Sequence, residues 1–114
     1  MRSELGDKER LGHILDATAL IEKALLNKSR EIFMEDYILQ AAIQRWIQII
    51  GEAASKISKI FRDMHSEVNW KAISGLRNII VHEYFGIDLE RIWEVAQSDV
   101  PELRIQLENL YNKA

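Results

Sequence analysis

The chain has 114 residues, one proline and no cysteine, and it carries a formal net charge of −3 at pH 7. Its length fits one domain spanning residues 1–114, and its hydrophobic share of 47% is enough to form a packed core. The absence of cysteine excludes disulfide frameworks and thiol nucleophiles, and no apolar run approaches the ~20 residues of a membrane-spanning helix.

The first ten residues, MRSELGDKER, lack the apolar core of a signal peptide, so we expect a soluble, cytoplasmic protein.

The N-terminal segment should form a helix. Over about residues 5–26, apolar residues recur every three or four positions, which predicts a helix. The sequence Asn27-Lys28-Ser29 should end this helix and lead into a short turn.

The clearest helical pattern covers about residues 35–64. Apolar residues recur every three or four positions for about six turns, and polar residues occupy the other side. Gly51 lies in the middle of this segment, where glycine costs about 1 kcal/mol relative to alanine. We therefore expect another helix to approach Gly51 closely, either within the fold or across a dimer.

Capping residues mark further helices in the second half of the chain. Asn69 should cap a helix that runs to Gly86, and Asp88 should cap another. Asp99-Val100-Pro101-Glu102 resembles a capping box with proline in the first turn, and it predicts the start of a last helix. The expected fold is all-α, a small up-and-down bundle of four or five helices.

Charge is unevenly distributed along the chain. Residues 45–82 carry six Lys or Arg side chains against three Asp or Glu, a local charge of +3, whereas both flanking regions are acidic. The overall acidity argues against a nucleic-acid-binding protein, but the cationic middle third could face a phosphate backbone. The alternative is an ordinary fluctuation of charge among solvated helix faces.

The segment from Arg77 to Tyr84 carries the residues best suited to chemistry. On an ideal helix Arg77 falls on an apolar stripe, where a guanidinium needs an anion, a carboxylate or a partner subunit. Asn78 and His82 are four residues apart, so the amide can orient the imidazole. Histidine suits proton transfer near neutral pH and arginine binds phosphate oxygens, which together favour a phosphodiester site without a metal.

The spacing of Arg77 and His82 restricts how they can meet. Five residues correspond to ~140° around an ideal helix, so the two side chains would not converge from one straight helix. Either the helix is distorted between them or the site is composite across two copies of the chain. An arginine on an apolar stripe agrees with the second option, so we predict a symmetric dimer with a shared cleft. A buried arginine ion pair and a packing histidine are the structural alternative.

Three sequence strings resemble a known family. GLRNIIVHEYF, the upstream IIGEAASKIS and the downstream GIDLERIWEV followed by DVPEL are similar to the HepT-type toxins of the HEPN superfamily. The similarity runs from about Leu11 to Leu110. HEPN proteins are small helical domains that commonly dimerise and carry an Arg-x4–6-His motif, to which Arg77 and His82 correspond. Asn78 corresponds to the polar residue after the arginine, and Tyr84 completes the Arg-x4-His-x-Tyr form.

The resemblance implies a metal-independent endoribonuclease toxin with a HEPN-like dimeric fold and no cofactor. Its partner would be a small nucleotidyltransferase antitoxin of the MNT type, which in such pairs can transfer AMP to the motif tyrosine, here Tyr84. Glu52, in the family-like GEA segment, could also face the cleft.

The expected mechanism uses the RNA 2′-hydroxyl as nucleophile and leaves a 2′,3′-cyclic phosphate. The competing hypotheses are a non-catalytic module that binds nucleotides or a partner protein, and a purely structural helical dimer.

Overall fold

The structure, a computed structural model, describes residues 2–81 and 88–113, and this part of the chain is helical with no strand. The first elements are α1 (Arg2–Leu25), α2 (Arg30–Glu35), α3 (Tyr37–Ser55) and α4 (Lys59–Met64). They are followed by α5 (Trp70–Gly75), α6 (Asn78–Val81), α7 (Leu89–Glu94), the π-helical segment η2 (Val95–Asp99) and α8 (Val100–Lys113). The predicted all-α class is therefore confirmed.

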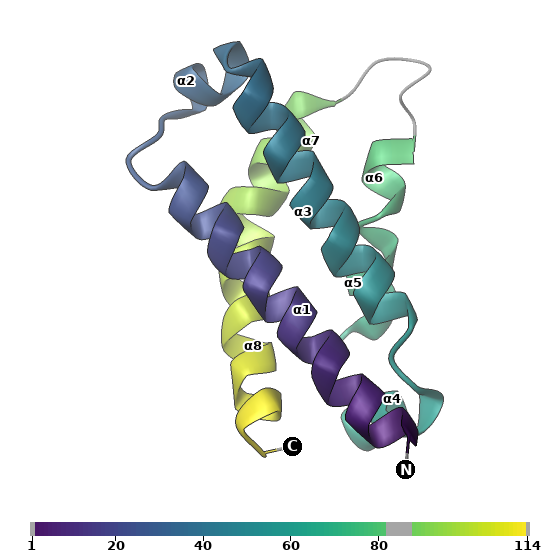
Figure 1. Cartoon of the computed structure of the whole chain (residues 1–114). Helices are drawn as coiled ribbons and strands as arrows, with labels where there is room; N and C mark the ends of the chain where they lie inside the picture. The colour runs from purple at the N-terminus through teal and green to yellow at the C-terminus, as the bar shows by residue number, and fades with distance from the viewer. Residues whose placement is uncertain (1, 82–87, 114) are drawn as a thin grey trace.

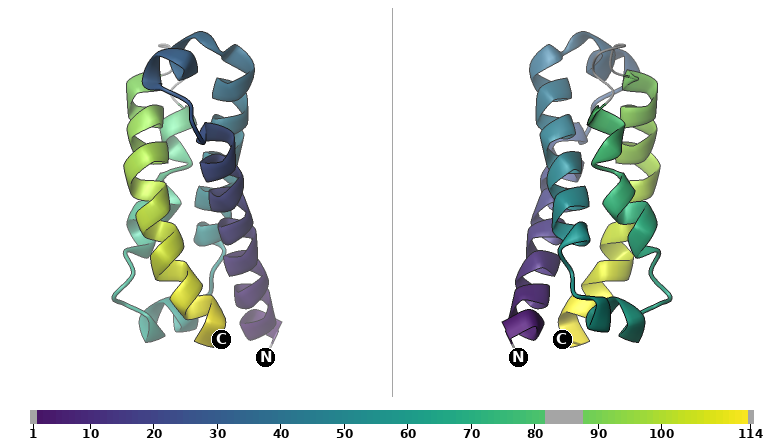
Figure 2. Two further views of the ribbon diagram at one scale, coloured as in Figure 1. Left: turned by 90° about the vertical axis from the view of Figure 1, so that its left-hand side faces the viewer. Right: turned by 90° about the vertical axis from the view of Figure 1, so that its right-hand side faces the viewer.

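The long helical segments run alternately up and down. In Figure 1, α1 rises from the N-terminus, α3 descends, α5 and α6 rise, and α7 to α8 descends to the C-terminus. Both termini consequently lie at the end of the molecule that carries α4, and α2 lies at the opposite end (Figures 1 and 2). α1 packs against α3 and α8, and α5 packs against α3. This arrangement places the α5–α6 segment, which carries Arg77, along one side of α3.

The end of α1 follows the sequence prediction. Asn27 adopts a φ of 62°, a left-handed conformation that asparagine tolerates better than most residues. Ser29 then accepts a hydrogen bond from the backbone N–H of Ile32 and caps α2. The expected turn thus contains a helix of six residues, and the ion pair between Arg30 and Glu90 connects this helix to α7.

The helix predicted over 35–64 is divided into α3 and α4, which corrects the sequence interpretation. α3 ends at Ser55, and Ser58 caps α4 by accepting a hydrogen bond from the N–H of Phe61. Asp7 of α1 holds this break in place, because its buried carboxylate accepts hydrogen bonds from the backbone N–H of Ser58 at 2.8 Å and from its hydroxyl at 2.6 Å. A contact between residues 51 positions apart thus overrides the local helical pattern.

The two C-terminal helices predicted from Asp88 and Asp99 form one continuous rod, a second correction. Asp88 does cap α7, since its side chain accepts from the N–H of Arg91. Asp99, however, lies inside the π-helical segment, where the N–H of Val100 donates to the carbonyl of Val95, five residues earlier. Proline has no N–H and its ring crowds the preceding turn, and a π turn accommodates Pro101 without ending the helix.

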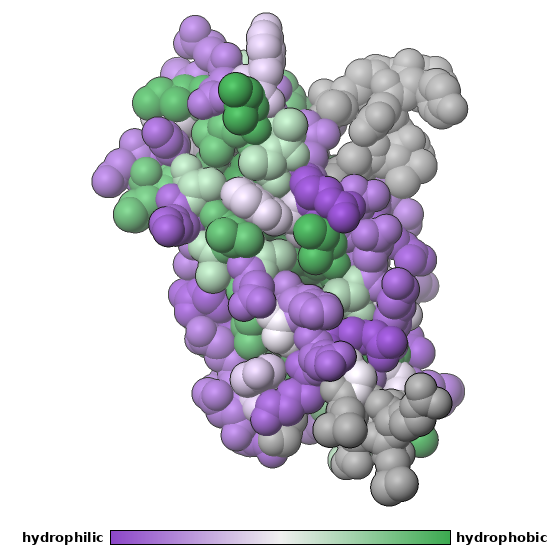
Figure 3. Space-filling view, viewed as in Figure 1, coloured by the Kyte–Doolittle hydropathy of each residue, from purple (hydrophilic) through white to green (hydrophobic). Residues whose placement is uncertain are grey.

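Buried aliphatic side chains fill the space between the helices. The core includes Leu11 and Ile14 of α1, Ile43 and Ile50 of α3, and Leu107 of α8. Exposed apolar side chains gather at the end where α1, α2 and α3 meet, as Figure 3 shows on the α1–α3 face. Among the described helices, none combines the length and the apolar character needed to cross a membrane.

Candidate functional site

Arg77 lies in a turn that joins α5 to α6. The backbone there forms bonds between residues three apart: Arg77 N–H donates to the Ser74 carbonyl at 3.4 Å, and Ile79 N–H donates to the Leu76 carbonyl at 3.2 Å. Ile73 and Leu76 are buried, whereas Arg77 is exposed. The ideal helix that placed Arg77 on an apolar stripe is therefore not formed, and the guanidinium is exposed at the surface of the single chain.

Gly51 fixes the position of the Arg77 backbone. A Cβ atom added at Gly51 would lie 2.5 Å from the backbone nitrogen of Arg77 and 2.8 Å from its Cβ. Gly51 is buried in the middle of α3, so this contact is the close approach that the sequence predicted, and it occurs within one chain. The absence of a side chain at Gly51 thus lets the turn carrying Arg77 rest directly on α3.

Replacing Gly51 with alanine should destabilise the protein and displace Arg77. The new methyl group would clash with backbone atoms, which cannot rotate away, so we expect a loss of ~1–3 kcal/mol in the free energy of unfolding despite the higher helix propensity of alanine. Denaturant unfolding of the two proteins measures this loss.

Gly75→Ala is the matched control for that experiment. Among the described residues, a Cβ at Gly75, in α5, would meet no atom within 4 Å beyond its own chain neighbours and helix backbone. Its unfolding free energy should therefore stay within about 1 kcal/mol of the parent protein, or rise slightly. Equal losses from both substitutions would contradict the close approach at Gly51.

The guanidinium of Arg77 has no carboxylate partner among residues 6–79 and 88–113. In contrast, Arg104 of α8 is held by Glu22 and Glu108, and the hydrogen bond and charge of Glu22 raise the pKa of Arg104 above its ordinary value. Arg104 is therefore committed to binding α8 to α1, whereas Arg77 is positioned to meet an anion from outside.

The other predicted site residues are only partly placed. Asn78 is exposed and begins α6, one residue after Arg77. His82 and Tyr84 lie outside the described residues, so the convergence of Arg77 with His82 and the pairing of Asn78 with His82 stay predictions.

Glu52 is exposed on α3, next to Gly51. One of its carboxylate oxygens lies 3.9 Å from a guanidinium nitrogen of Arg45. It lines a hollow of about 310 Å³ between α1 and α3, together with Glu9, His13 and Lys56. Within the described part of the chain, no ion pair joins Glu52 to Arg77, so the structure groups Glu52 with α1 and its role in an RNA cleft stays a prediction.

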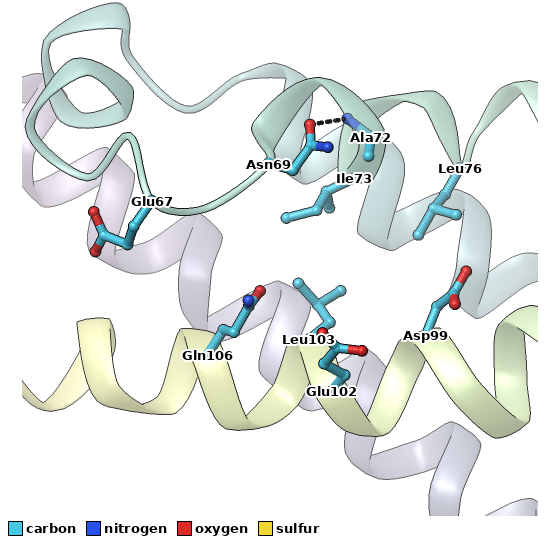
Figure 4. A pocket seen from close by; sticks show the side chains of 9 residues that line it. All are labelled: Glu67, Asn69, Ala72, Ile73, Leu76, Asp99, Glu102, Leu103 and Gln106. Carbon is cyan, nitrogen blue, oxygen red and sulfur yellow. Dashed lines mark hydrogen bonds between the residues drawn. The ribbon is translucent and has the colours of Figure 1, made fainter.

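Two hollows of different charge flank α5. One, of about 320 Å³, lies between α5 and the η2–α8 segment, and Figure 4 shows the carboxylates of Glu67, Asp99 and Glu102 at its sides. The other, of about 590 Å³, lies between α4 and α5 and is lined by Lys59, Arg62 and Lys71. Sequence analysis did not locate either hollow, although the three cations of the second belong to the cationic middle third.

Known proteins similar to this chain identify its family. Residues 14–110 match the family described as "Ribonuclease HepT-like". The chain belongs to the HepT-like ribonuclease family. This family lies within the HEPN superfamily, in agreement with the predicted resemblance and the helical fold. No solved structure matched the chain significantly.

Three relatives show how far the similarity to HepT-like proteins extends. The chain is 39% identical to a protein named "Putative RNase" from Caldanaerobacter subterraneus subsp. tengcongensis, over 90% of this chain and 92% of the relative. It is 35% identical to the "Probable ribonuclease HepT" of Thermococcus cleftensis, over 90% and 94% of the two chains. It also shares 37% identity with the "Gamma-glutamylcyclotransferase and putative RNase" of Methanocaldococcus jannaschii, of which it covers 44%.

Proposed function

We propose that this HepT-like chain is an endoribonuclease that works without a metal ion and acts as the toxin of a toxin–antitoxin pair. The observation that carries the proposal is the exposed side chain of Arg77, which lies against Gly51 of α3 and has no carboxylate partner among the described residues, in a chain of the HepT-like ribonuclease family. The names of the relatives support an RNase activity.

In the proposed reaction, the RNA 2′-hydroxyl oxygen attacks the adjacent phosphorus atom. His82 acts either as the general base that accepts the hydroxyl proton or as the general acid that protonates the departing 5′ oxygen. Arg77 stabilises the negative charge that grows on the non-bridging oxygens in the transition state, and Asn78 orients the imidazole or a phosphate oxygen. The products are a 2′,3′-cyclic phosphate and a free 5′-hydroxyl.

We further propose that two copies form a symmetric dimer whose shared cleft is lined by both motifs. The exposure of Arg77 in the single chain supports this arrangement, because the side chain is accessible to a second copy and to RNA.

The proposed antitoxin is an MNT-type nucleotidyltransferase that attaches AMP to Tyr84. The added nucleotide would bring bulk and negative charge to the sequence next to Arg77 and so exclude the anionic substrate.

The test of this pairing is expression of the chain alone and together with the product of its neighbouring gene. We expect growth arrest that the neighbour relieves, and whole AMP units in the intact mass of the coexpressed chain. The modification should disappear in Tyr84→Phe and persist in the matched control Tyr37→Phe, because Tyr37 lies outside the motif and, at 80% exposed on α3, is accessible to a transferase. Modification that survives Tyr84→Phe but is lost in Tyr37→Phe would contradict the assignment.

A non-catalytic module that binds nucleotides or a partner protein is the second candidate. The net charge of −3 and the three carboxylates beside α5 favour it, because both oppose RNA binding. This candidate predicts stable binding of a nucleotide or partner with no cleavage of any RNA.

A further inference from the structure

The hollow between α4 and α5 has an excess of cations, because three line it, Lys59, Arg62 and Lys71, against two carboxylates, Asp63 and Glu67. Lys59 pairs with Asp63, whose carboxylate lies 2.7 Å from its ammonium nitrogen. The 3.9 Å contact of Glu67 with His65 is an ion pair only when the imidazole is protonated, and no carboxylate pairs with Arg62 or Lys71 among the described residues. These two cations can attract an anion from solvent.

Arg62 lines this hollow and carries a donor that the described residues leave unsatisfied. Its Nε atom is buried and has no hydrogen-bond partner in the described part of the chain. A buried N–H without an acceptor is unfavourable, and a guanidinium N–H binds a phosphate oxygen strongly. Arg62 and the exposed Lys71 thus supply two cations to the hollow for an anionic ligand.

Between the hollow and Arg77, the surface of α5 is open at Gly75. Lys71 and Gly75 are four residues apart and share one face of the helix, and Asn78 follows three residues later. Apart from Gly75 itself, its chain neighbours and the backbone of α5, no atom of the described residues lies within 4 Å of the position that a Gly75 Cβ would occupy, so the helix surface is open at this point. Lys71 precedes Arg77 by six residues, so their Cα atoms lie at most ~22 Å apart, which a strand of a few nucleotides can span.

The opposite side of α5 cannot serve the same purpose. There the carboxylates of Glu67, Asp99 and Glu102 surround the other hollow and would repel a phosphate backbone (Figure 4). Glu67 lines both hollows, so the difference in charge across α5 comes from Asp99 and Glu102 on one side and from Arg62 and Lys71 on the other.

We propose that the α4–α5 hollow, lined by Arg62 and Lys71, binds the phosphate backbone of substrate RNA outside the cleavage site. The proposal rests on the proposed ribonuclease function. In this arrangement Arg77 binds the phosphate that is cleaved, and the hollow binds a phosphate a few nucleotides away and holds the strand in place.

The test is binding of a fluorescently labelled, single-stranded 2′-O-methyl RNA to the full chain, measured by anisotropy at several salt concentrations. This RNA lacks the free 2′-hydroxyl, so binding is read without cleavage. Lys71→Glu should weaken binding by roughly tenfold and lower the slope of log affinity against log salt by about 1. Arg62→Gln should weaken binding in the same direction.

Lys28→Glu is the matched control, because it makes the same change in net charge at an exposed position between α1 and α2, at the far end of the bundle. It should bind as the parent chain does, within about twofold. Binding unchanged in both Lys71→Glu and Arg62→Gln, or weakened equally by Lys28→Glu, would overturn the proposal. Cleavage of unmodified RNA by the parent chain is scored separately, so a failure of the ribonuclease function is distinguishable from a failure of the hollow.

Discussion

Replacing His82 with alanine should reduce RNA cleavage by a factor of about 10²–10⁴, the usual contribution of a positioned general acid or base. The imidazole is the group that moves the proton in the proposed reaction, and no other histidine lies within the sequence segment that carries Arg77. The measurement is kcat/KM on an RNA substrate, together with the melting temperature of each variant.

His13→Ala is the matched control for His82→Ala. His13 is exposed on α1 and lines the hollow that also contains Glu52, away from the α5–α6 turn. Its replacement should leave the cleavage rate within about twofold. Cleavage by His82→Ala at the parent rate would remove the imidazole from the mechanism.

Replacing Arg77 with alanine should reduce cleavage by about 10²–10³ and leave the fold intact. The loss of rate follows from removing the donors that stabilise charge in the transition state. The fold should persist because the side chain is exposed, and exposed substitutions usually change the free energy of unfolding by less than ~0.5 kcal/mol. Arg77→Lys should recover only part of the activity, since lysine keeps the charge but loses the planar fork.

Arg45→Ala supplies the comparison for Arg77→Ala. Arg45 is also an exposed arginine, and it lies on α3 with Glu52 as its nearest carboxylate. We expect it to cleave RNA at the parent rate. If Arg77→Ala instead lowers the melting temperature strongly and its activity falls only in proportion to the unfolded fraction, Arg77 is a structural residue.

Local signals in the sequence predicted the helix boundaries that depend on neighbouring residues. Asn69 caps α5 through a hydrogen bond from the N–H of Ala72, and Asp88 caps α7, both as expected from side chains that satisfy free N–H groups. Gly51, inside α3, also predicted a close approach. Glycine lowers the stability of a helix relative to alanine, and a helix tolerates this loss where another segment requires the space of the side chain.

Features that depend on distant residues were not predictable in this way. The break before α4 requires Asp7, which lies on another helix and accepts the hydrogen bonds of Ser58. The residues around Pro101 are compatible both with a π turn inside a helix and with the start of a new helix. Only the packing of the continuous rod distinguishes the two. The exposure of Arg77 likewise follows from the turn at the end of α5, which an ideal helical wheel omits.

The chemistry of the ends produced by cleavage tests the central claim most directly. Purified chain should cut RNA in the presence of EDTA, and every 5′ fragment should end in a 2′,3′-cyclic phosphate while the 3′ fragment carries a 5′-hydroxyl. Mass spectrometry of the fragments reads both ends at once. Fragments with 3′-hydroxyl and 5′-phosphate ends, or cleavage that EDTA abolishes, would contradict attack by the 2′-hydroxyl assisted by Arg77 and His82.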